Sequence, residues 1–469
     1  MDVVVIETSQ LGDRSYLVHD GSVALVVDPQ RDTDRVEAAA RDAGVTITHV
    51  AETHIHNDYL TGGLELSKAH GASYLVNAAD QVTFERQPIT DGQTVQVGSL
   101  TVRAVATPGH THTHLSFIVD DGDRQAVFSG GSLLYGSVGR TDLVGAGDTL
   151  GLTHDQYASV HRLVREAAPD AALFPTHGFG SFCSSGPASG AGSSTIGEQL
   201  TSNHALTDPD EEHFVQELIA NLTAYPSYYA HMGVLNAAGP GPAALAVPAP
   251  LDAAELTRRL AEGGWVADLR RRVAFASNHL RGSVSFEYGT NFSTYLGWIV
   301  PWGEQVTLVG SRDEVEKAIR DLSRIGIESP DAAVGTDPHT LAPGAGLASY
   351  PREGWEGLLS RRAPGDTVVD VRRADEFAVS RVAGAVNVPL HELLRRLDAI
   401  PAGRLWVHCA SGYRAGIAAS LLQRAGRDVV HVDARFAGAG SAGIPMDTAR
   451  RAATAPAAGD LPDPARPID

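Results

Sequence analysis

Short apolar runs alternate with amphipathic stretches along most of this chain, which is the pattern of an α/β protein. Near the N-terminus, apolar runs separated by turn residues predict strands at Val3–Glu7, Ser15–His19 and Ala24–Val27. The apolar residues of Asp32–Ala43 have helical spacing, and Gly44 follows as a C-cap. Thr46–Glu52 then predicts another strand, and the polar sequence THIHNDY follows it directly. Its histidines are therefore expected at a strand end, where a sheet can hold them in place.

Two breaks in composition divide the 469 residues into predicted domains. Both segments are rich in Ala, Gly and Pro, and they read as linkers at 236–252 and 337–354. The sequence thus predicts domains at 1–235, 253–336 and 355–448. The tail, 449–469, is rich in Ala, Pro and Asp, lacks an apolar period, and is expected to be disordered.

The second and third predicted domains resemble two copies of one unit. Trp265–Arg272 (WVADLRRR) aligns with Thr367–Ala374 (TVVDVRRA), and Val306–Glu314 aligns with Leu405–Arg414. Each copy is predicted to form a strand, a turn, a second strand and a loop that leads into a helix. Only the second copy has a cysteine in that loop.

Composition excludes several classes of function. Hydrophobic residues make up 43% and charged residues 20%, with a formal net charge of -19. Nucleic-acid and anionic-membrane binders need clustered Lys and Arg, so neither partner is expected. No apolar run is long enough to span a bilayer, and the N-terminus does not read as a signal peptide. The two distant cysteines, Cys183 and Cys409, are not a disulfide framework and favour a reducing cytoplasm.

The sequence CASGYR places a cysteine between a predicted buried strand and a predicted helix. Cys409 follows the strand Arg404–His408, and the helix is expected over Ala415–Arg424. Backbone N–H groups of such a loop, the positive end of the helix dipole and the charge of Arg414 would all favour a thiolate. The loop residues are Ala410, Ser411, Gly412 and Tyr413.

This loop resembles the active-site loop of rhodaneses, Cys-x-x-Gly-x-Arg, and the flanking DVRRADEF and GAVNVPL also match that family. The resemblance implies that Cys409 accepts a sulfane sulfur and passes it to a thiol or cyanide. Dual-specificity phosphatases have a similar loop with one more residue before the arginine. A buried, inert cysteine is the remaining alternative.

Four segments of the N-terminal region resemble the metallo-β-lactamase fold, in particular persulfide dioxygenases fused to rhodanese domains. They are THIHNDYLTGG, ATPGHTHTHLSF, GSVGRTDL and PTHGFGS, in that order. YPSYYAHMGVLN (Tyr225–Asn236) also resembles a segment of the fusion subgroup. The resemblance implies an α/β multidomain chain: an αββα sandwich followed by two rhodanese-like domains, the first without its nucleophile and acting as a spacer.

The family's metal ligands map onto His54, His56, Asp58, His110 and His177. Two positions depart from the family pattern. Tyr59 stands where HxHxDH ends in histidine, and Gly131 stands where an aspartate usually bridges two metals. Both losses argue against a dinuclear hydrolase, and Gly131 is expected to leave space for substrate or water.

Three outcomes are open at a metal site without this aspartate. His56 or His177 completes a three-histidine site with His54 and His110, Asp58 or Asp142 replaces the carboxylate, or the site is catalytically silent. The isolated histidines are expected to be structural, with His114 as the best exception; they are His112, His114, His154, His161, His204 and His231.

Cys183 follows His177 in HGFGSFCSSG, where related fusion proteins often have a cysteine. It is a candidate catalytic residue that would carry or contact a persulfide, and a small buried apolar side chain is an equal alternative.

The leading hypothesis is a persulfide dioxygenase and sulfurtransferase with one Fe(II) per chain, or Zn in its place. Its expected partners are a low-molecular-weight thiol persulfide, O2 and thiosulfate, and a homo-oligomer is compatible with it. One alternative is a rhodanese-type sulfurtransferase with a degenerate N-terminal domain. Another is a mononuclear Zn hydrolase of a thioester or lactone. Which thiol carries the persulfide is left open by the sequence.

Overall fold

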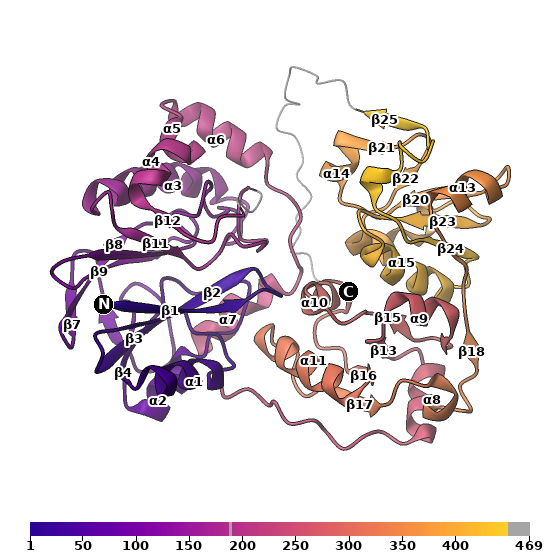
Figure 1. The fold of residues 1–469 in the computed structure, drawn as a ribbon, viewed down its shortest axis with the longest axis horizontal. Helices are drawn as coiled ribbons and strands as arrows, with labels where there is room; N and C mark the ends of the chain where they lie inside the picture. Colours follow the sequence, from indigo (N-terminus) through magenta and orange to yellow (C-terminus); the bar gives the residue numbers. More distant parts are fainter. Residues whose placement is uncertain (187–189, 449–469) are drawn as a thin grey trace. The chain divides into compact units, whose positions relative to one another are not determined.

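The computed structural model describes residues 1–186 and 190–448 of the chain (Figure 1). These residues fold into two compact units. The first comprises Met1–Ala244 with Arg320–Ile327, and the second comprises Leu245–Ile319 and the described chain from 328 onward. The tail expected at 449–469 lies outside the described residues.

The first unit contains two six-stranded sheets. The strands of the first sheet, in spatial order, are β1 (Asp2–Thr8), β2 (Asp13–His19), β3 (Val23–Val27), β4 (Thr46–Ala51), β5 (Ser73–Asn77) and β6 (Gln87–Ile89). Those of the second are β12 (Ser194–Thr195), β11 (Ala172–Pro175), β10 (Gln125–Gly130), β9 (Leu115–Asp120), β8 (Leu100–Ala106) and β7 (Thr94–Val97).

Helices cover the outer face of each sheet, as Figure 1 shows on the left. They are α1 (Asp34–Ala43), α2 (Gly63–His70), α3 (Thr149–Glu166), α4 (Ile196–Ser202), α5 (His204–Thr207) and α6 (Glu211–Ala220). A further helix, α7 (Tyr229–Ala238), contacts the loop after β4. One apolar core, with Tyr16 and Phe117, lies between the two sheets. Two further cores join the first sheet to α1 and α2, and the second sheet to α3 and α6. The predicted αββα sandwich is therefore confirmed.

The second unit begins with a four-stranded parallel sheet. Its order is β15 (Val284–Ser285), β13 (Trp265–Asp268), β16 (Val306–Gly310) and β17 (Asp331–Val334). Its helices are α8 (Ala253–Ala261), α9 (Arg272–Ser277), α10 (Phe292–Ile299), α12 (Pro338–Leu341) and the part of α11 (Arg312–Arg324) that precedes Arg320. A short antiparallel pair joins β14 (His279–Leu280) to β18 (Leu347–Ala348).

A five-stranded parallel sheet completes the second unit. Its order is β19 (Arg352–Glu353), β24 (Val429–Val432), β23 (Leu405–His408), β20 (Thr367–Asp370) and β22 (Val386–Asn387). The other elements are α13 (Trp355–Arg361), α14 (Ala374–Val379), β21 (Ser380–Val382), η1 (Leu390–Ala399), α15 (Tyr413–Arg424), η2 (Phe436–Gly438) and β25 (Met446–Thr448).

The two sheets of the second unit repeat one arrangement. The order β15-β13-β16-β17 corresponds to β22-β20-β23-β24. An Asp-x-Arg ion pair recurs at the end of the matching strands, with Asp268–Arg270 at 2.5 Å and Asp370–Arg372 at 2.6 Å. Asp268 pairs with Val309, and Asp370 pairs with His408. The next residues, Gly310 and Cys409, are therefore structurally equivalent.

Both segments predicted to be linkers contain regular structure. α7 continues to Ala238, three residues past the expected domain limit at 235, and α12, β18 and β19 lie within 337–354. Within the part of the chain that the structure describes, no helix combines the length and apolar character needed to cross a membrane.

Candidate functional site

The five predicted metal ligands lie in loops at strand ends of the first unit. The loop after β4 supplies His54, His56 and Asp58, while the loops after β8 and β11 supply His110 and His177. All five side chains are buried, with at most 1% of their surface exposed. Ligand atoms of His54, His110 and His177 lie within 4.8 Å of one another, and His56 and Asp58 form a second such group with His177. The structure therefore brings the whole predicted set together.

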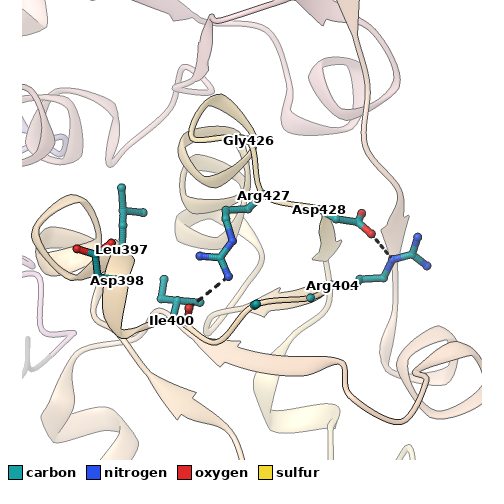
Figure 2. A pocket seen from close by; sticks show the side chains of 9 residues that line it. Leu397, Asp398, Ile400, Arg404, Gly426, Arg427 and Asp428 are labelled. Carbon is teal, nitrogen blue, oxygen red and sulfur yellow. Dashed lines mark hydrogen bonds and ion pairs between the residues drawn. The ribbon is translucent and has the colours of Figure 1, made fainter.

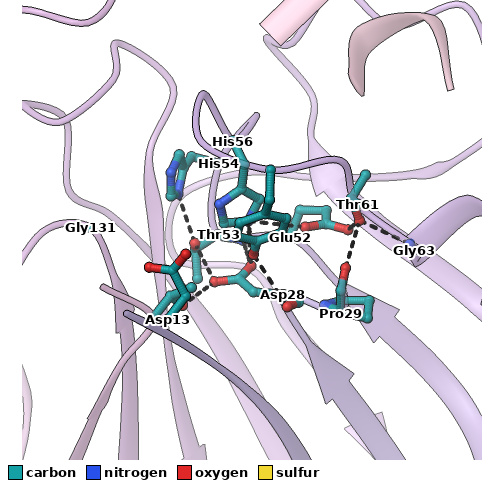
Figure 3. Close-up of polar contacts among 12 residues, drawn as sticks. Asp13, Asp28, Pro29, Glu52, Thr53, His54, His56, Thr61, Gly63 and Gly131 are labelled. Carbon is teal, nitrogen blue, oxygen red and sulfur yellow. Dashed lines mark hydrogen bonds and ion pairs between the residues drawn. The ribbon is translucent and has the colours of Figure 1, made fainter. Parts of the chain in front are cut away.

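Hydrogen bonds orient two of these rings. His110 Nδ1 lies 2.7 Å from the carbonyl oxygen of Arg140, which only accepts, so Nδ1 carries the proton. His54 Nδ1 lies 2.9 Å from Thr53 Oγ1, whose hydroxyl donates to Asp28, so this nitrogen is also the donor. Figure 3 shows Thr53 between His54 and Asp28. In both rings the lone pair is then on Nε2.

Two carboxylates hold His177. Its Nδ1 lies 2.9 Å from Asp13 Oδ1 and 3.2 Å from Asp58 Oδ2, while its Nε2 faces His54 Nε2 at 3.5 Å. Burial lowers the pKa of His177, but Asp58 and Asp13 outweigh it and raise that pKa well above its usual value. Burial and the Asp58 charge raise the pKa of Asp13 to about 8. Such pairing makes an imidazole a stronger metal ligand through its other nitrogen.

His56 is anchored through the opposite nitrogen. Its Nε2 lies 3.3 Å from both Asp28 Oδ1 and Glu52 Oε2 (Figure 3). The same atom lies 3.0 Å from the hydroxyl of Tyr59. Burial lowers the pKa of His56, but Asp28 and Glu52 together raise it to about 9. Its Nδ1 is buried and makes no hydrogen bond within the described residues. Tyr59, which replaces the family's histidine, therefore supports His56 here.

These orientations fit a single divalent metal ion. His110 Nε2 is buried without a hydrogen-bond partner in the described part of the chain, and it converges with the Nε2 atoms of His54 and His177. Burial lowers the pKa of His110 to about 3, so the ring is neutral and its lone pair is available. Three imidazole nitrogens with open positions suit Fe or Zn. Of the two histidines left open by the sequence, His177 is the one that forms a group with His54 and His110.

At the missing carboxylate, the structure contradicts one expectation, the space at Gly131, and one of the open alternatives, Asp142. Gly131 does not leave open space, since a Cβ there would lie 2.2 Å from His110 Cδ2; the His110 ring occupies that volume. Asp142 does not turn toward the histidines, because Arg140 binds both its oxygens, at 2.6 and 2.7 Å.

Two further residues support the site. His114, singled out in the sequence as the exception among the isolated histidines, accepts a hydrogen bond at 3.0 Å from Gly131 N and stacks on His54 with ring centroids 4.9 Å apart. Asn236, in α7, donates to the carbonyls of His56 and Tyr59, both at 2.8 Å. Asn236 lay at the start of a predicted linker, and only its burial identifies its role in the histidine loop.

Cys183 is buried, and the carboxylates of Asp58 and Asp13 lie near enough to act on its thiol. Burial and the charges of Asp58 and Asp13 raise the pKa of its thiol well above the usual value. A protonated thiol is a poor nucleophile, because the thiolate is the reactive form.

We therefore expect Cys183→Ser to leave sulfur transfer within about threefold of wild type, since a hydroxyl can replace a thiol that only donates. The measurement is thiosulfate:cyanide transfer together with persulfide oxidation. A loss of either activity above tenfold, in protein with an unchanged melting temperature, would instead support Cys183 as a sulfur carrier.

The second predicted site surrounds Cys409, between β23 and α15. Gly412 N donates to Cys409 Sγ at 3.2 Å, and Gly412 has φ +92°, a conformation that favours glycine. The first N–H groups of α15 have no acceptor within the helix, so they are available to an anion at the loop. Arg414 is held by two hydrogen bonds to Glu376, at 2.5 and 2.8 Å. Cys409 is fully buried, whereas Ser411 is exposed.

In the first copy of the repeat, the loop after β16 is equivalent to the Cys409 loop, and the carboxylate of Glu314 occupies its hydrogen-bond donors. Glu314 Oε2 accepts from Ser311 N at 2.8 Å and from Ser311 Oγ at 2.7 Å, and Ser311 Oγ accepts from Glu314 N at 3.3 Å. This is a capping box at the start of α11. A sulfur anion would have to compete with Glu314 for these donors.

A pocket in the last domain lies away from Cys409. It is lined by Leu397, Asp398, Ile400, Ala402, Gly403, Arg404, Gly426, Arg427 and Asp428 (Figure 2). Arg404 precedes β23 and Cys409 follows it, so the pocket is at the opposite end of the strand. Its ion pair, Arg404–Asp428 at 2.9 Å, is exposed. The pocket is not part of the sulfur site.

Comparisons with known proteins match this division of the chain. Residues 12–178 match the metallo-beta-lactamase superfamily, and residues 356–438 match the rhodanese-like domain. The chain is 29% identical over 208 residues to the mitochondrial persulfide dioxygenase ETHE1 of Homo sapiens, which is 44% of this chain and 73% of that protein. ETHE1 of Bos taurus matches equally.

Other relatives catalyse different reactions. An atrochrysone carboxyl ACP thioesterase of Aspergillus terreus is 32% identical over 140 residues, 29% of this chain and 42% of that protein, so the match spans less than half its length. A crystal structure of a metallo-beta-lactamase from Staphylococcus aureus subsp. aureus COL superposes with a TM-score of 0.65 at 25% identity. It covers 71% of this chain and 99% of that one.

The chain therefore combines a metallo-β-lactamase domain, with a buried histidine cluster that could hold a metal ion, and a rhodanese-like domain with its cysteine loop. This combination indicates an enzyme, and the ETHE1 matches support the expected resemblance to persulfide dioxygenases and a role in sulfur metabolism.

Proposed function

We propose that the chain is a persulfide dioxygenase joined to a sulfurtransferase. The observation that carries the proposal is the convergence of the Nε2 atoms of His54, His110 and His177 in one buried centre, on a chain that also holds Cys409 at a helix N-terminus. The identity with persulfide dioxygenases supports Fe(II) as the metal and a low-molecular-weight thiol persulfide as the substrate.

The oxidation would follow RSSH + O2 + H2O → RSH + SO3²⁻ + 2 H⁺, in which four electrons pass from sulfur to O2. The metal, when bound, would supply open positions for the sulfur and for O2. The chain's own residues orient the three imidazoles: Thr53 and the Arg140 carbonyl fix His54 and His110, while Asp13 and Asp58 fix His177. Burial of all three rings excludes bulk water.

The transfer half would use Cys409 as the sulfur carrier. Its thiolate would attack the outer sulfur of thiosulfate, form a Cys–S–S⁻ persulfide and release sulfite. A thiol or cyanide would then take the outer sulfur and return the thiolate. Gly412 N and the free amides of α15 would stabilise the charge on the outer sulfur. Glu376 would keep Arg414 extended beside the loop.

One observation favours a second candidate, a sulfurtransferase with a silent N-terminal domain. Gly131 removes the family's carboxylate, and the His110 ring fills the place where that side chain would start. The metal centre would then have three neutral nitrogen ligands and a different charge from that of the family.

Anaerobically Fe(II)-loaded protein mixed with glutathione persulfide tests the proposal. We expect O2 uptake matched by an equal amount of sulfite, and none from protein stripped with a chelator, because the histidines alone cannot activate O2. Zn-loaded protein is the control: it should bind metal but take up no O2. If Fe(II)-loaded protein takes up no O2 but still transfers sulfur, the second candidate is correct.

A further inference from the structure

A buried histidine of the last domain contacts the backbone of the Cys409 loop. His431, in β24, has its Nε2 atom 2.9 Å from the carbonyl oxygen of Gly412. The same oxygen accepts the first hydrogen bond of α15, from Gly416 N, also at 2.9 Å. The carbonyl at the junction of loop and helix therefore has two donors, one local and one from a strand.

The other ring nitrogen of His431 makes no hydrogen bond among the described residues. A carbonyl only accepts, so Nε2 of His431 carries the proton and Nδ1 carries the lone pair. Nδ1 is buried and has no hydrogen-bond partner among the described residues. Burial lowers the pKa of His431 to about 4, so the ring is neutral at physiological pH. A buried, unsatisfied acceptor destabilises a fold, which suggests that the ring serves another purpose.

The direction of the Gly412 carbonyl decides where the next amide points. The C=O and N–H of a trans peptide point in opposite directions, so a carbonyl held toward β24 aims the N–H of Tyr413 into the loop. Gly412 has φ +92° and no side chain to restrict it. A Cβ there would lie 2.0 Å from Asp433 Oδ1, and φ +92° would strain any residue with a side chain. The orientation of this peptide therefore depends on the two donors to its carbonyl, Gly416 N and His431 Nε2.

We infer that His431 is a positioning residue for sulfur transfer: by holding the Gly412 carbonyl, it keeps the amides of the loop aimed at the outer sulfur of the Cys409 persulfide. The inference rests on the sulfurtransferase function proposed above. His431 does not touch the substrate and acts through the peptide between Gly412 and Tyr413.

Two substitutions of His431 by side chains of equal length distinguish a positioning role from a packing role. His431→Gln places an amide N–H near the position of Nε2, whereas His431→Met fills the same volume without a donor. We expect the kcat of thiosulfate:cyanide transfer to fall about tenfold in His431→Met, with KM within about twofold, because one stabilised donor is lost but the binding groups remain. His431→Gln should recover kcat to within about threefold of wild type.

His279→Met is the matched control. His279 is equally buried in the same unit, but its ring contacts the Phe275 carbonyl and Gln423 instead of the loop. We expect its kcat to equal that of wild type.

Each outcome separates the two proposals. A wild-type protein that transfers no sulfur would overturn the proposed function itself. A wild-type protein that transfers sulfur, with a folded His431→Met variant of equal kcat, would overturn the positioning role. If His431→Met does not fold, His431→Asn takes its place, since its shorter amide does not reach Gly412, and equal rates for the Asn and Gln variants would overturn the role.

Discussion

His110→Ala is expected to abolish O2 uptake and to remove the bound metal, while sulfur transfer through Cys409 continues. The buried Nε2 atom of His110 converges with those of His54 and His177, and nothing in the described chain competes for it. Loss of a ligand should cost more than loss of a supporting residue, so persulfide oxidation should fall at least about 100-fold. Metal content by mass spectrometry and O2 uptake by electrode measure the effect.

His112→Ala provides the control for this variant. His112 is two residues away, about half exposed, and its Nε2 lies 3.8 Å from Asp148, so its loss should change neither metal content nor uptake. Retention of metal and O2 uptake by His110→Ala would mean that the three-histidine centre is not the site of oxidation.

Cys409→Ser should abolish sulfur transfer and leave persulfide oxidation unchanged. The serine hydroxyl can accept the hydrogen bond from Gly412 N that Cys409 Sγ accepts. It is far less acidic than a thiol and cannot form a persulfide. Loss of the nucleophile should reduce thiosulfate:cyanide transfer at least about 1,000-fold. The measurement is thiocyanate formation, with O2 uptake followed on the same preparation.

A substitution in the equivalent loop of the other copy is the control for Cys409. Ser311→Ala removes the hydroxyl of the capping box but no predicted carrier, so transfer should continue at the wild-type rate. Residual transfer by Cys409→Ser would point to a second carrier, and Cys183 is the other cysteine in the sequence.

Much of the metal site follows from the sequence because its ligands are local to strand ends. THIHNDY comes directly after an apolar run, and β4 does end at Ala51, just before it. The positions of His110 and His177 followed from resemblance, since neither has a strong local pattern of its own. The fold class likewise followed from alternating apolar runs and from the family motifs.

The supporting contacts could not be predicted, because they join residues distant in sequence. Asp13 lies 164 residues before His177, and Asn236 lies 180 residues after His56. Each looks like an ordinary surface or linker residue until the sheets pack. The direction of each imidazole depends on these contacts, so the sequence left open whether His56 or His177 completes the centre.

The volume beside Gly131 was mispredicted for a related reason. Replacing aspartate by glycine removes atoms, which suggests a hole, but a close-packed interior does not keep one. The His110 ring occupies that place, and Gly131 N bonds to His114 instead.

The capped loop of the first copy bears on how the two copies can diverge. Gly310 occupies the position of Cys409, so a single codon change could install a thiol there. That thiol would face the Glu314 carboxylate, whose Oε2 would lie 3.2 Å from the new Cβ, where Cys409 has Gly412 N. The negative charge of Glu314 would disfavour the thiolate, so a second sulfur carrier would need the loss of this carboxylate as well as the new cysteine. A cysteine alone in the first copy would therefore not compete with Cys409 for sulfur.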